Sequence, residues 1–189
     1  MKNIILYIIV LFLTSCCTSR QSPKVQYSSD SSLSIRSYRL QGNEKINKGD
    51  WEGAYRDFIK VIELVPNYDT AFYNLGKISS KLGHNKEAIA YYTKAIEVNA
   101  HCLFAYYNRG NSKANLGDIQ GAIDDYTEAI KINPQYTKAY LNRGLNKAKR
   151  NDYKGAISDY TQAIKINNQY ANAFYNRGNA KSNLGDNKG

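Results

Sequence analysis

From residue 35 onward, apolar and polar positions alternate with the spacing of α-helices. The apolar side chains of one segment are Ile119, Ala122, Ile123, Tyr126, Ala129 and Ile130. Their i, i+3, i+4, i+7 pattern predicts a helix that begins after an Asp118 N-cap and runs to about Ile132. Phe104 to Leu116 predicts the helix before it, with Gly117 in the glycine C-cap place. The residue before Pro134 avoids the α region, so Asn133 ends the pair.

The helix pair repeats with a period of 34 residues. The segment Tyr-Tyr-Asn-Arg-Gly at 106–110 returns as Tyr-Leu-Asn-Arg-Gly at 140–144 and as Phe-Tyr-Asn-Arg-Gly at 174–178. Four complete units are predicted at 35–68, 69–102, 103–136 and 137–170, and a partial fifth unit at 171–189. We number the positions of each unit as places 1 to 34, so that Gly110 and Gly144 both stand at place 8.

Antiparallel helix pairs of this length, with small residues at Gly110 and Ala122 and an aromatic residue at Tyr126, resemble tetratricopeptide (TPR) repeats. The resemblance covers residues 35–189. It implies an all-α fold, a right-handed α-solenoid of antiparallel helix pairs in which stacked neighbours bury the apolar faces. For the last helix, 172–184, two interpretations stay open. It is either a lid on the fourth unit or the first helix of a truncated copy of a longer array.

The N-terminal segment is predicted to be a targeting signal. The apolar run Ile4–Leu13 reaches only about 15 Å as a helix, roughly half of the bilayer core, which fits a secretory signal better than a membrane span. Leu13-Thr14-Ser15-Cys16 resembles the lipobox of bacterial lipoprotein precursors. The resemblance implies a signal peptide at 1–15 and a lipidated Cys16, carrying acyl chains such as palmitate. A plain signal peptide and an uncleaved anchor are the alternatives.

Residues 16–34 are predicted to be the lipidated cysteine and a flexible Ser-rich tether, because they have almost no apolar periodicity. We therefore expect a protein of the bacterial cell envelope, lipid-anchored to a membrane and facing the periplasm or the exterior. By resemblance to enterobacterial sorting, Cys17 in place of aspartate after the lipidated residue favours the outer membrane of a Gram-negative cell.

Composition and charge further restrict the classes of protein and of ligand that fit this chain. The chain has 26 basic and 16 acidic residues, a net charge of +10 and 42% hydrophobic residues, which exclude a polytopic membrane protein, a collagen-like chain and a fully disordered one. Because an exported protein does not meet nucleic acid in the cytoplasm, we expect no nucleic-acid ligand. We also expect no small-molecule substrate, cofactor or metal.

His84 and His101 stand in no acid–base or ligand pattern, so no enzyme is predicted. Cys17 and Cys102 could pair in an oxidising compartment.

Comparison of the units with one another predicts ion pairs between places 7 and 23. The residues at these places are, unit by unit, Gln41 and Asp57, Leu75 and Tyr91, Arg109 and Asp125, and Arg143 and Asp159. Both charges are missing together in the second unit, and the first unit is a partial exception. We therefore expect Arg109 to pair with Asp125 and Arg143 with Asp159 at the helix interface, the alternative being solvated charges without contact.

In TPR arrays the first helices line a concave groove through places 2, 5, 6, 9, 12 and 13. Of the thirty residues at these places here, six are basic and none is acidic, so the groove should favour acidic or carboxylate-ended ligands. The candidate groove residues are Arg36, Arg39, Asn43, Tyr73, Asn74, Lys77, Lys81, Phe104, Tyr107, Asn108, Asn111, Lys138, Asn142, Lys149 and Asn176.

An asparagine recurs at place 6 of four units, as Asn74, Asn108, Asn142 and Asn176. An amide both donates and accepts, so a ladder of amides can satisfy the main chain of an extended peptide whatever its side chains are. The carboxylate clamp of chaperone-binding TPR domains is only half present. Arg39, Asn43 and Asn74 fit it, but Phe104 and Asn108 stand where cations belong.

The sequence therefore predicts a membrane-tethered protein-interaction scaffold that binds an extended, acidic peptide or partner protein of the envelope in its concave groove. The alternative is an envelope assembly lipoprotein, of the type that serves pilus secretin or outer-membrane protein assembly, which would use its convex face. An enzyme would need an activity that disappears when His84 or His101 is replaced.

Overall fold

The structure of the protein is a computed structural model that describes residues 29–185, with side chains from residue 32. The predicted signal peptide, Cys16, most of the tether and the Cys17 half of the possible disulfide lie outside the described residues. Within them the chain forms helices and no strands. The helices are α2 (Ser29–Lys48), α3 (Trp51–Leu64), α4 (Asp69–Lys81), α5 (Asn85–Val98), α6 (Leu103–Asn115), α7 (Ile119–Ile132), α8 (Thr137–Lys149), α9 (Tyr153–Ile166) and α10 (Ala171–Asn183).

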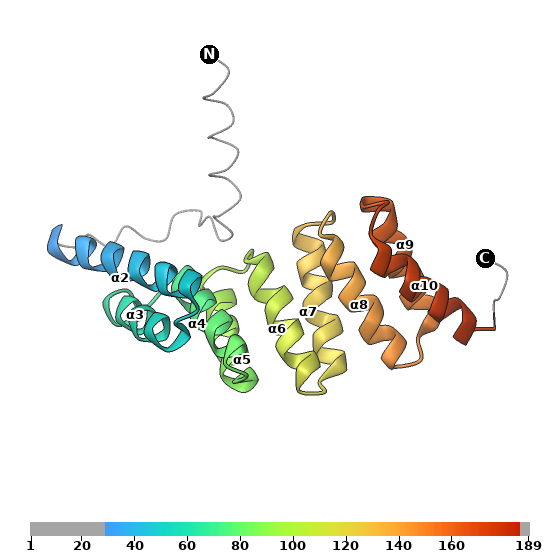
Figure 1. Cartoon of the computed structure of the whole chain (residues 1–189), viewed down its shortest axis with the longest axis horizontal. Coiled ribbons are helices and arrows are strands. Elements are labelled where there is room, and N and C mark those ends of the chain that lie inside the picture. Colours follow the sequence, from blue (N-terminus) through green and yellow to red (C-terminus); the bar gives the residue numbers. More distant parts are fainter. Residues whose placement is uncertain (1–28, 186–189) are drawn as a thin grey trace, which may run out of the picture.

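The helices follow one another along the long axis of the molecule, from α2 at one end to α10 at the other (Figure 1). Each helix packs against the next one in the chain, and the first helices α4, α6, α8 and α10 also contact one another in that order. Contacts are therefore restricted to neighbouring units, as in a solenoid. The predicted all-α solenoid and its 34-residue helix pairs are confirmed.

The first helix begins earlier than predicted. We expected the flexible tether to extend to residue 34, but α2 starts at Ser29, so 29–34 is helical and this part of the prediction was wrong. The physical reason is that an existing helix can grow by one hydrogen bond per added residue. Such growth requires no apolar periodicity and tolerates the serines whose abundance, together with the missing periodicity, predicted a tether.

Left-handed residues and aspartate caps set the turns within the units. Gly117 has φ of +83° between α6 and α7, and Asn151 takes the same place in the fourth unit with φ of +62°. The Asp118 side chain then accepts a hydrogen bond of 2.9 Å from the backbone N–H of Gly121. The predicted ends of this helix pair are thus correct to within one residue, because cap chemistry is local.

The core of each complete unit is an aromatic ring pressed against a glycine. The rings at place 24 are Phe58, Tyr92, Tyr126 and Tyr160, all at most 1% exposed. In the third unit, a Cβ built on Gly110 would lie 2.8 Å from Cε1 of Tyr126, closer than carbon atoms pack. Glycine at place 8 therefore lets the two helices of a unit approach each other. Among residues 29–185, no helix has both the length and the apolarity needed to cross a bilayer.

Candidate functional site

The candidate groove residues form a stripe along the first helices, at places 2, 5, 6, 9, 12 and 13 of the units, and of these helices α4, α6, α8 and α10 contact one another in that order. The sets on α4, α6 and α8 are joined across the units by side-chain hydrogen bonds. Asn108 Nδ2 donates to the Tyr73 hydroxyl at 3.3 Å, and Asn142 Nδ2 donates to the Tyr107 hydroxyl at 3.1 Å. Tyrosine at place 5 of one unit thus holds asparagine at place 6 of the next. The stripe is one continuous surface from α4 to α8.

The two ends of the asparagine ladder differ from its centre. Asn74 Nδ2 donates to the Thr70 carbonyl at 2.9 Å, and Asn176 Nδ2 to the Asn172 carbonyl at 2.7 Å. Asn176 turns back onto its own helix because the preceding unit has Leu141, which lacks a hydroxyl, in the tyrosine place. The ladder therefore connects units only where a tyrosine precedes the asparagine.

These contacts change what the central amides can offer to a ligand. Asn142 Nδ2 donates both to Tyr107 and to Asn111 Oδ1, the latter at 2.9 Å, and Tyr126 donates to the same oxygen at 2.8 Å. An amide nitrogen has two N–H groups, so the donors of Asn142 are engaged within the protein and its carbonyl oxygen is the group left to face a ligand. The sequence pattern did not indicate this structural role.

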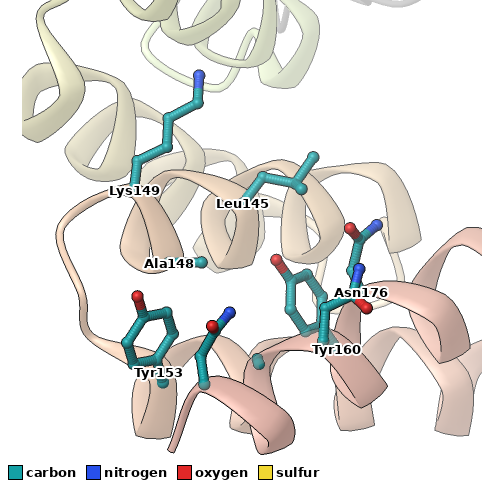
Figure 2. Close-up of a pocket in the computed structure, with 9 residues that line it drawn as sticks. Leu145, Ala148, Lys149, Tyr153, Tyr160 and Asn176 are labelled. Atoms are coloured by element: carbon teal, nitrogen blue, oxygen red, sulfur yellow. The ribbon is translucent and has the colours of Figure 1, made fainter.

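A hollow of about 300 Å³ opens between α8, α9 and α10. Its lining consists of Leu145, Ala148, Lys149, Tyr153, Tyr160, Asn176, Asn179, Ala180 and Asn183. Six of these nine residues stand at the groove places of units four and five. Figure 2 shows the hydroxyls of Tyr153 and Tyr160 directed into the space below α8, whereas the Lys149 side chain extends away from it.

Tyr160 is a functional candidate that the sequence analysis missed. Its counterpart Tyr126 donates to Asn111, but the fourth unit has Leu145 in place of Asn111, and Tyr160 donates no hydrogen bond within residues 29–185. Burial raises the pKa of the Tyr160 phenol from 10.0 to about 12, with a further contribution from the charge of Asp159. The phenol is therefore a neutral hydrogen-bonding group at the bottom of the hollow. The leucine at place 9 of the fourth unit was the sequence feature that could have indicated this free hydroxyl.

A second hollow, also about 300 Å³, surrounds Lys138 where two units meet. Its lining includes Tyr136 and Tyr170. Beside it, the candidate residues Phe104 and Tyr107 pack edge-on against the Tyr136 ring, with centroids 5.5 and 5.1 Å apart. Phe104 and Tyr107 thus form part of the stripe surface, and both side chains are half-buried.

The cations of the stripe keep an uncompensated charge. Within residues 29–185, none of Arg36, Arg39, Lys77, Lys81, Lys138 and Lys149 forms an ion pair. No Asp or Glu stands at the groove places either. The six cations lie on α2, α4 and α8, so the stripe has a positive potential around these helices, whereas its residues on α6 and α10 are neutral.

The candidates on α2 are less closely joined to the others. Arg39 Nη1 donates to the Tyr68 hydroxyl at 2.9 Å, which directs it to the turn before α4. Arg36 and Asn43 are exposed on α2. No hydrogen bond joins either of these two side chains to the stripe on α4 in the described part of the chain.

The arginines at place 7 of the third and fourth units are neutralised at the interface between the two helices of each unit. Arg109 binds Asp125 in a bidentate pair of 2.9 and 2.7 Å, and Arg143 binds Asp159 at 3.0 and 2.7 Å. Both predicted ion pairs are confirmed. Each arginine also reaches back to the preceding unit, as Arg109 Nη1 donates to Thr93 Oγ1 at 3.0 Å.

The sequence comparison missed the third member of these clusters, a lysine at place 11. Lys113 lies 2.9 Å from Asp125, Lys147 lies 2.9 Å from Asp159, and Lys45 lies 2.7 Å from Asp57. The first unit is therefore no exception, because its lysine replaces the missing arginine as the partner of Asp57. The signal was present, since the second unit has Ser79 at this place and also lacks the aspartate.

Neither histidine lies in a setting suited to catalysis. His84 is exposed, 3.6 Å from Glu87 on the same helix turn, and His101 is exposed at a unit boundary. In the part of the chain that the structure describes, no three His, Cys, Asp or Glu side chains gather closely enough to hold a metal ion.

Comparison with known families agrees with this architecture. Family models described as tetratricopeptide repeat match residues 69–102 and 104–136, and a model described as TPR repeat matches 42–83 and 147–185. The chain belongs to the tetratricopeptide-repeat family. None of the curated proteins compared with this TPR protein matches it.

Several solved TPR structures are similar to the chain over most of its length. A crystal structure of MamA has 30% sequence identity and a TM-score of 0.75, covering 77% of this chain and 85% of that one. A second MamA structure has 29% identity and a TM-score of 0.78, covering 82% and 84%. YrrB, described as a TPR protein with an unusual peptide-binding site, has 24% identity and a TM-score of 0.68, covering 78% and 75%.

Proposed function

We propose that the protein is a membrane-tethered, non-enzymatic interaction scaffold that binds an extended, acidic peptide or partner segment along the first-helix stripe. The observation that carries this proposal is the contrast between two sets of cations. Arg109, Arg143 and the place-11 lysines of their units are neutralised by aspartates, whereas the six stripe cations form no ion pair in the described residues. A ligand with carboxylates would supply the missing charge.

The two hollows support a peptide rather than a flat partner surface. The hollow at Tyr160 offers a phenol and three asparagines beside Leu145, and the hollow at Lys138 offers aromatic walls. Small concave sites with a few polar groups suit individual side chains of an extended segment. Among structurally similar proteins, one TPR domain of RPAP3 is bound to the HSP90 peptide SRMEEVD, an acidic sequence.

Charge reversal of the stripe tests the proposal. We expect the combined variant Lys77→Glu, Lys81→Glu, Lys138→Glu and Lys149→Glu to lose partners captured by crosslinking in intact cells, because the potential changes sign. The matched control reverses four exposed lysines of second helices, Lys86, Lys131, Lys154 and Lys165. If only the control variant lost its partners, the second-helix surface would be the binding face and an envelope assembly role would replace this one.

The tether is tested separately from the groove. We propose that Cys16 is lipidated in the bacterial envelope, so Cys16→Ser should move the protein from the membrane fraction to the soluble fraction and remove the acyl mass from the mature chain. Cys17→Ser is the matched control and should change neither readout. Equal behaviour of the two variants would contradict a lipid anchor at Cys16.

A further inference from the structure

The hollow between α8, α9 and α10 contains a buried hydroxyl that lacks the acceptor of its counterpart. In the third unit, Asn111 Oδ1 accepts hydrogen bonds from the Tyr126 hydroxyl at 2.8 Å and from Asn142 Nδ2 at 2.9 Å. The fourth unit has Leu145 in place of Asn111, and Tyr160 forms no hydrogen bond in the described part of the chain. A buried hydroxyl without an acceptor costs free energy, so an oxygen atom supplied by a ligand would be favourable here.

The Tyr160 hydroxyl faces the hollow, where further hydrogen-bond donors lie. Tyr160 is only 1% exposed as a whole, but Figure 2 shows its hydroxyl directed into the space below α8. Three asparagines of α10, Asn176, Asn179 and Asn183, line the same space. Asn176 Nδ2 uses one of its two N–H groups for the Asn172 carbonyl, so the other can donate to a ligand. The hollow thus offers a phenol and several amides to one acceptor group.

The charges around the hollow favour a carboxylate over a neutral acceptor. The fourth unit has seven basic and two acidic residues. Asp159 pairs with Arg143 at 2.7 Å and with Lys147 at 2.9 Å. Asp152 caps α9 by accepting from the backbone N–H of Gly155 at 2.9 Å. Because the lining of the hollow contains no Asp or Glu, the excess of cations in this unit should attract an anion to it.

We infer that the hollow binds a glutamate side chain of the segment held in the groove, an inference that rests on the proposed function. One carboxylate oxygen would accept from the Tyr160 hydroxyl, and amides of α10 would donate to the other. The apolar part of the lining, formed by Leu145, Ala148 and Ala180, suits the two methylene groups of glutamate. Aspartate has one methylene group fewer and would bury less apolar surface there.

The hollow is separate from the carboxylate-clamp pattern. The residues that fit that pattern, Arg39, Asn43 and Asn74, stand on α2 and α4. The walls of the hollow are α8 and α10, which contact each other directly, and α9 lies between them at the bottom. All three helices belong to the described residues, so the glutamate site is complete without any further element.

Short peptides that differ only in their central residue provide the probe. The isotope-labelled full chain is titrated with the blocked peptide Gly-Ser-Glu-Ser-Gly, and NMR follows the side-chain amide signals of the α10 asparagines. We expect saturable shifts at Asn176, Asn179 and Asn183. Glutamine at the centre should weaken binding about tenfold, because hydrogen bonds to a charged acceptor are stronger than those to a neutral one. Aspartate should also bind more weakly than glutamate.

Two substitutions test the hydrogen bond to the phenol. Tyr160→Phe keeps the ring and removes the hydroxyl, so it should weaken binding of the glutamate peptide about tenfold. Leu145→Asn supplies an internal acceptor of the kind that Tyr126 has in Asn111, so it should weaken binding too, without lowering the midpoint of thermal unfolding. Tyr92→Phe is the matched control, because Tyr92 is also 1% exposed but lines neither hollow. It should bind the peptide like the natural protein.

Reversal of the α4 cations separates this inference from the proposed function. Lys77→Glu combined with Lys81→Glu should reduce partner capture in cells but leave the peptide titration nearly unchanged, because neither lysine lines the hollow. The inference is wrong if the glutamate peptide produces no saturable shift at the α10 asparagines, or if Tyr160→Phe binds it as well as Tyr92→Phe does. Loss of partners from the four-lysine variant would still support the groove in that case. Retention of partners by that variant would instead overturn the proposed function.

Discussion

Glycine at place 8 decides how closely the two helices of a unit can pack. The ring of Tyr160 occupies the space that a side chain at residue 144 would need, since a Cβ added to Gly144 would lie 2.7 Å from Cε1 of that ring. Glycine costs a helix roughly 1 kcal/mol relative to alanine, so its presence in the middle of α8 indicates that packing outweighs propensity. Gly178 lies at the same place of its helix, but no ring lies beside it. A substitution there therefore measures helix propensity without the packing cost.

We expect Gly144→Ala to destabilise the protein by about 1–3 kcal/mol, because the overpacking cost exceeds the gain in helix propensity. Gly178→Ala is the matched control and should raise the free energy of unfolding by about 0.5–1 kcal/mol. Chemical denaturation followed by circular dichroism measures both. Equal effects of the two substitutions would show that contact with Tyr160 is unimportant.

The buried phenols make the protein sensitive to alkaline pH. Burial raises the pKa of Tyr92 and Tyr126 above the ordinary range and that of Tyr160 from 10.0 to about 12. The unfolded chain releases these protons first, so stability is fully present below pH 10 and falls as pH rises towards 12. For Tyr160 alone the slope is at most about 1.4 kcal/mol per pH unit.

Denaturation between pH 8 and 12 tests this dependence. Tyr160→Phe should reduce the slope above pH 10, because a phenyl ring does not ionise. Tyr175→Phe, at a position 71% exposed, should leave the slope unchanged and serves as control. A slope that is the same in all three proteins would contradict the contribution of Tyr160.

In unit three and in unit four, the interface between the two helices of the unit contains a buried cluster of one carboxylate and two cations. The Asp125 side chain is 4% exposed, against 16% for Arg109 and 21% for Lys113. The link from Arg109 to Thr93 extends the cluster to the preceding unit. The cluster therefore links α5, α6 and α7 through polar contacts.

We expect Asp125→Ala to cost about 3 kcal/mol or more, because two partly buried cations would lose their partner. The triple variant Arg109→Leu, Lys113→Met and Asp125→Leu should stay within about 1–2 kcal/mol of the natural protein, since apolar replacement of a whole buried cluster is often neutral. The second unit, with buried Leu75 at the arginine place, already lacks the cluster.

Unfolding in denaturant distinguishes these outcomes, and Glu128→Ala is the control. Glu128 pairs with Lys131 at 2.6 Å, but both side chains are exposed, so its loss should have an effect close to zero. A triple variant as unstable as Asp125→Ala would contradict this expectation and show that the charged cluster itself stabilises the interface.

The molecule as a whole is a linear stack in which equivalent units supply equivalent contacts. Arg143 donates to Thr127 at 3.1 Å as Arg109 donates to Thr93 at 3.0 Å. Asn142 uses Tyr107 as Asn108 uses Tyr73. If one unit is removed, the units on either side of it can therefore pack against each other and keep most of the contacts between neighbouring units.

We expect deletion of residues 103–136 to leave a folded, fully helical but less stable protein, in which Arg143 contacts Thr93 and Asn142 contacts Tyr73. Deletion of residues 103–119, half a unit, is the control and should abolish cooperative unfolding, because it brings α5 against α7 out of phase. Circular dichroism and thermal unfolding compare the two. Similar behaviour of both deletions would argue against unit-by-unit stacking.

The repeat made most of this fold predictable without coordinates. Helix ends such as Gly117 and Asp118 depend on cap chemistry within a few residues, and the pairing of Arg109 with Asp125 was visible because internal copies vary together. The start of α2 was not predictable in this way, since helix extension left no periodic trace in the Ser-rich segment. Lys45, Lys113 and Lys147 were recognisable in principle but were overlooked.

Three-dimensional packing decided which polar groups are available for binding. The regular asparagines indicated a ladder, but whether Asn142 faces a ligand or its neighbours depended on Tyr107 and Asn111, which come from another unit. The phenol at the bottom of the hollow likewise followed from Leu145 standing in the place of the asparagine that would accept from Tyr160. Local spacing fixes helices because their hydrogen bonds are local, whereas the availability of a side chain depends on contacts between units that lie 34 residues apart.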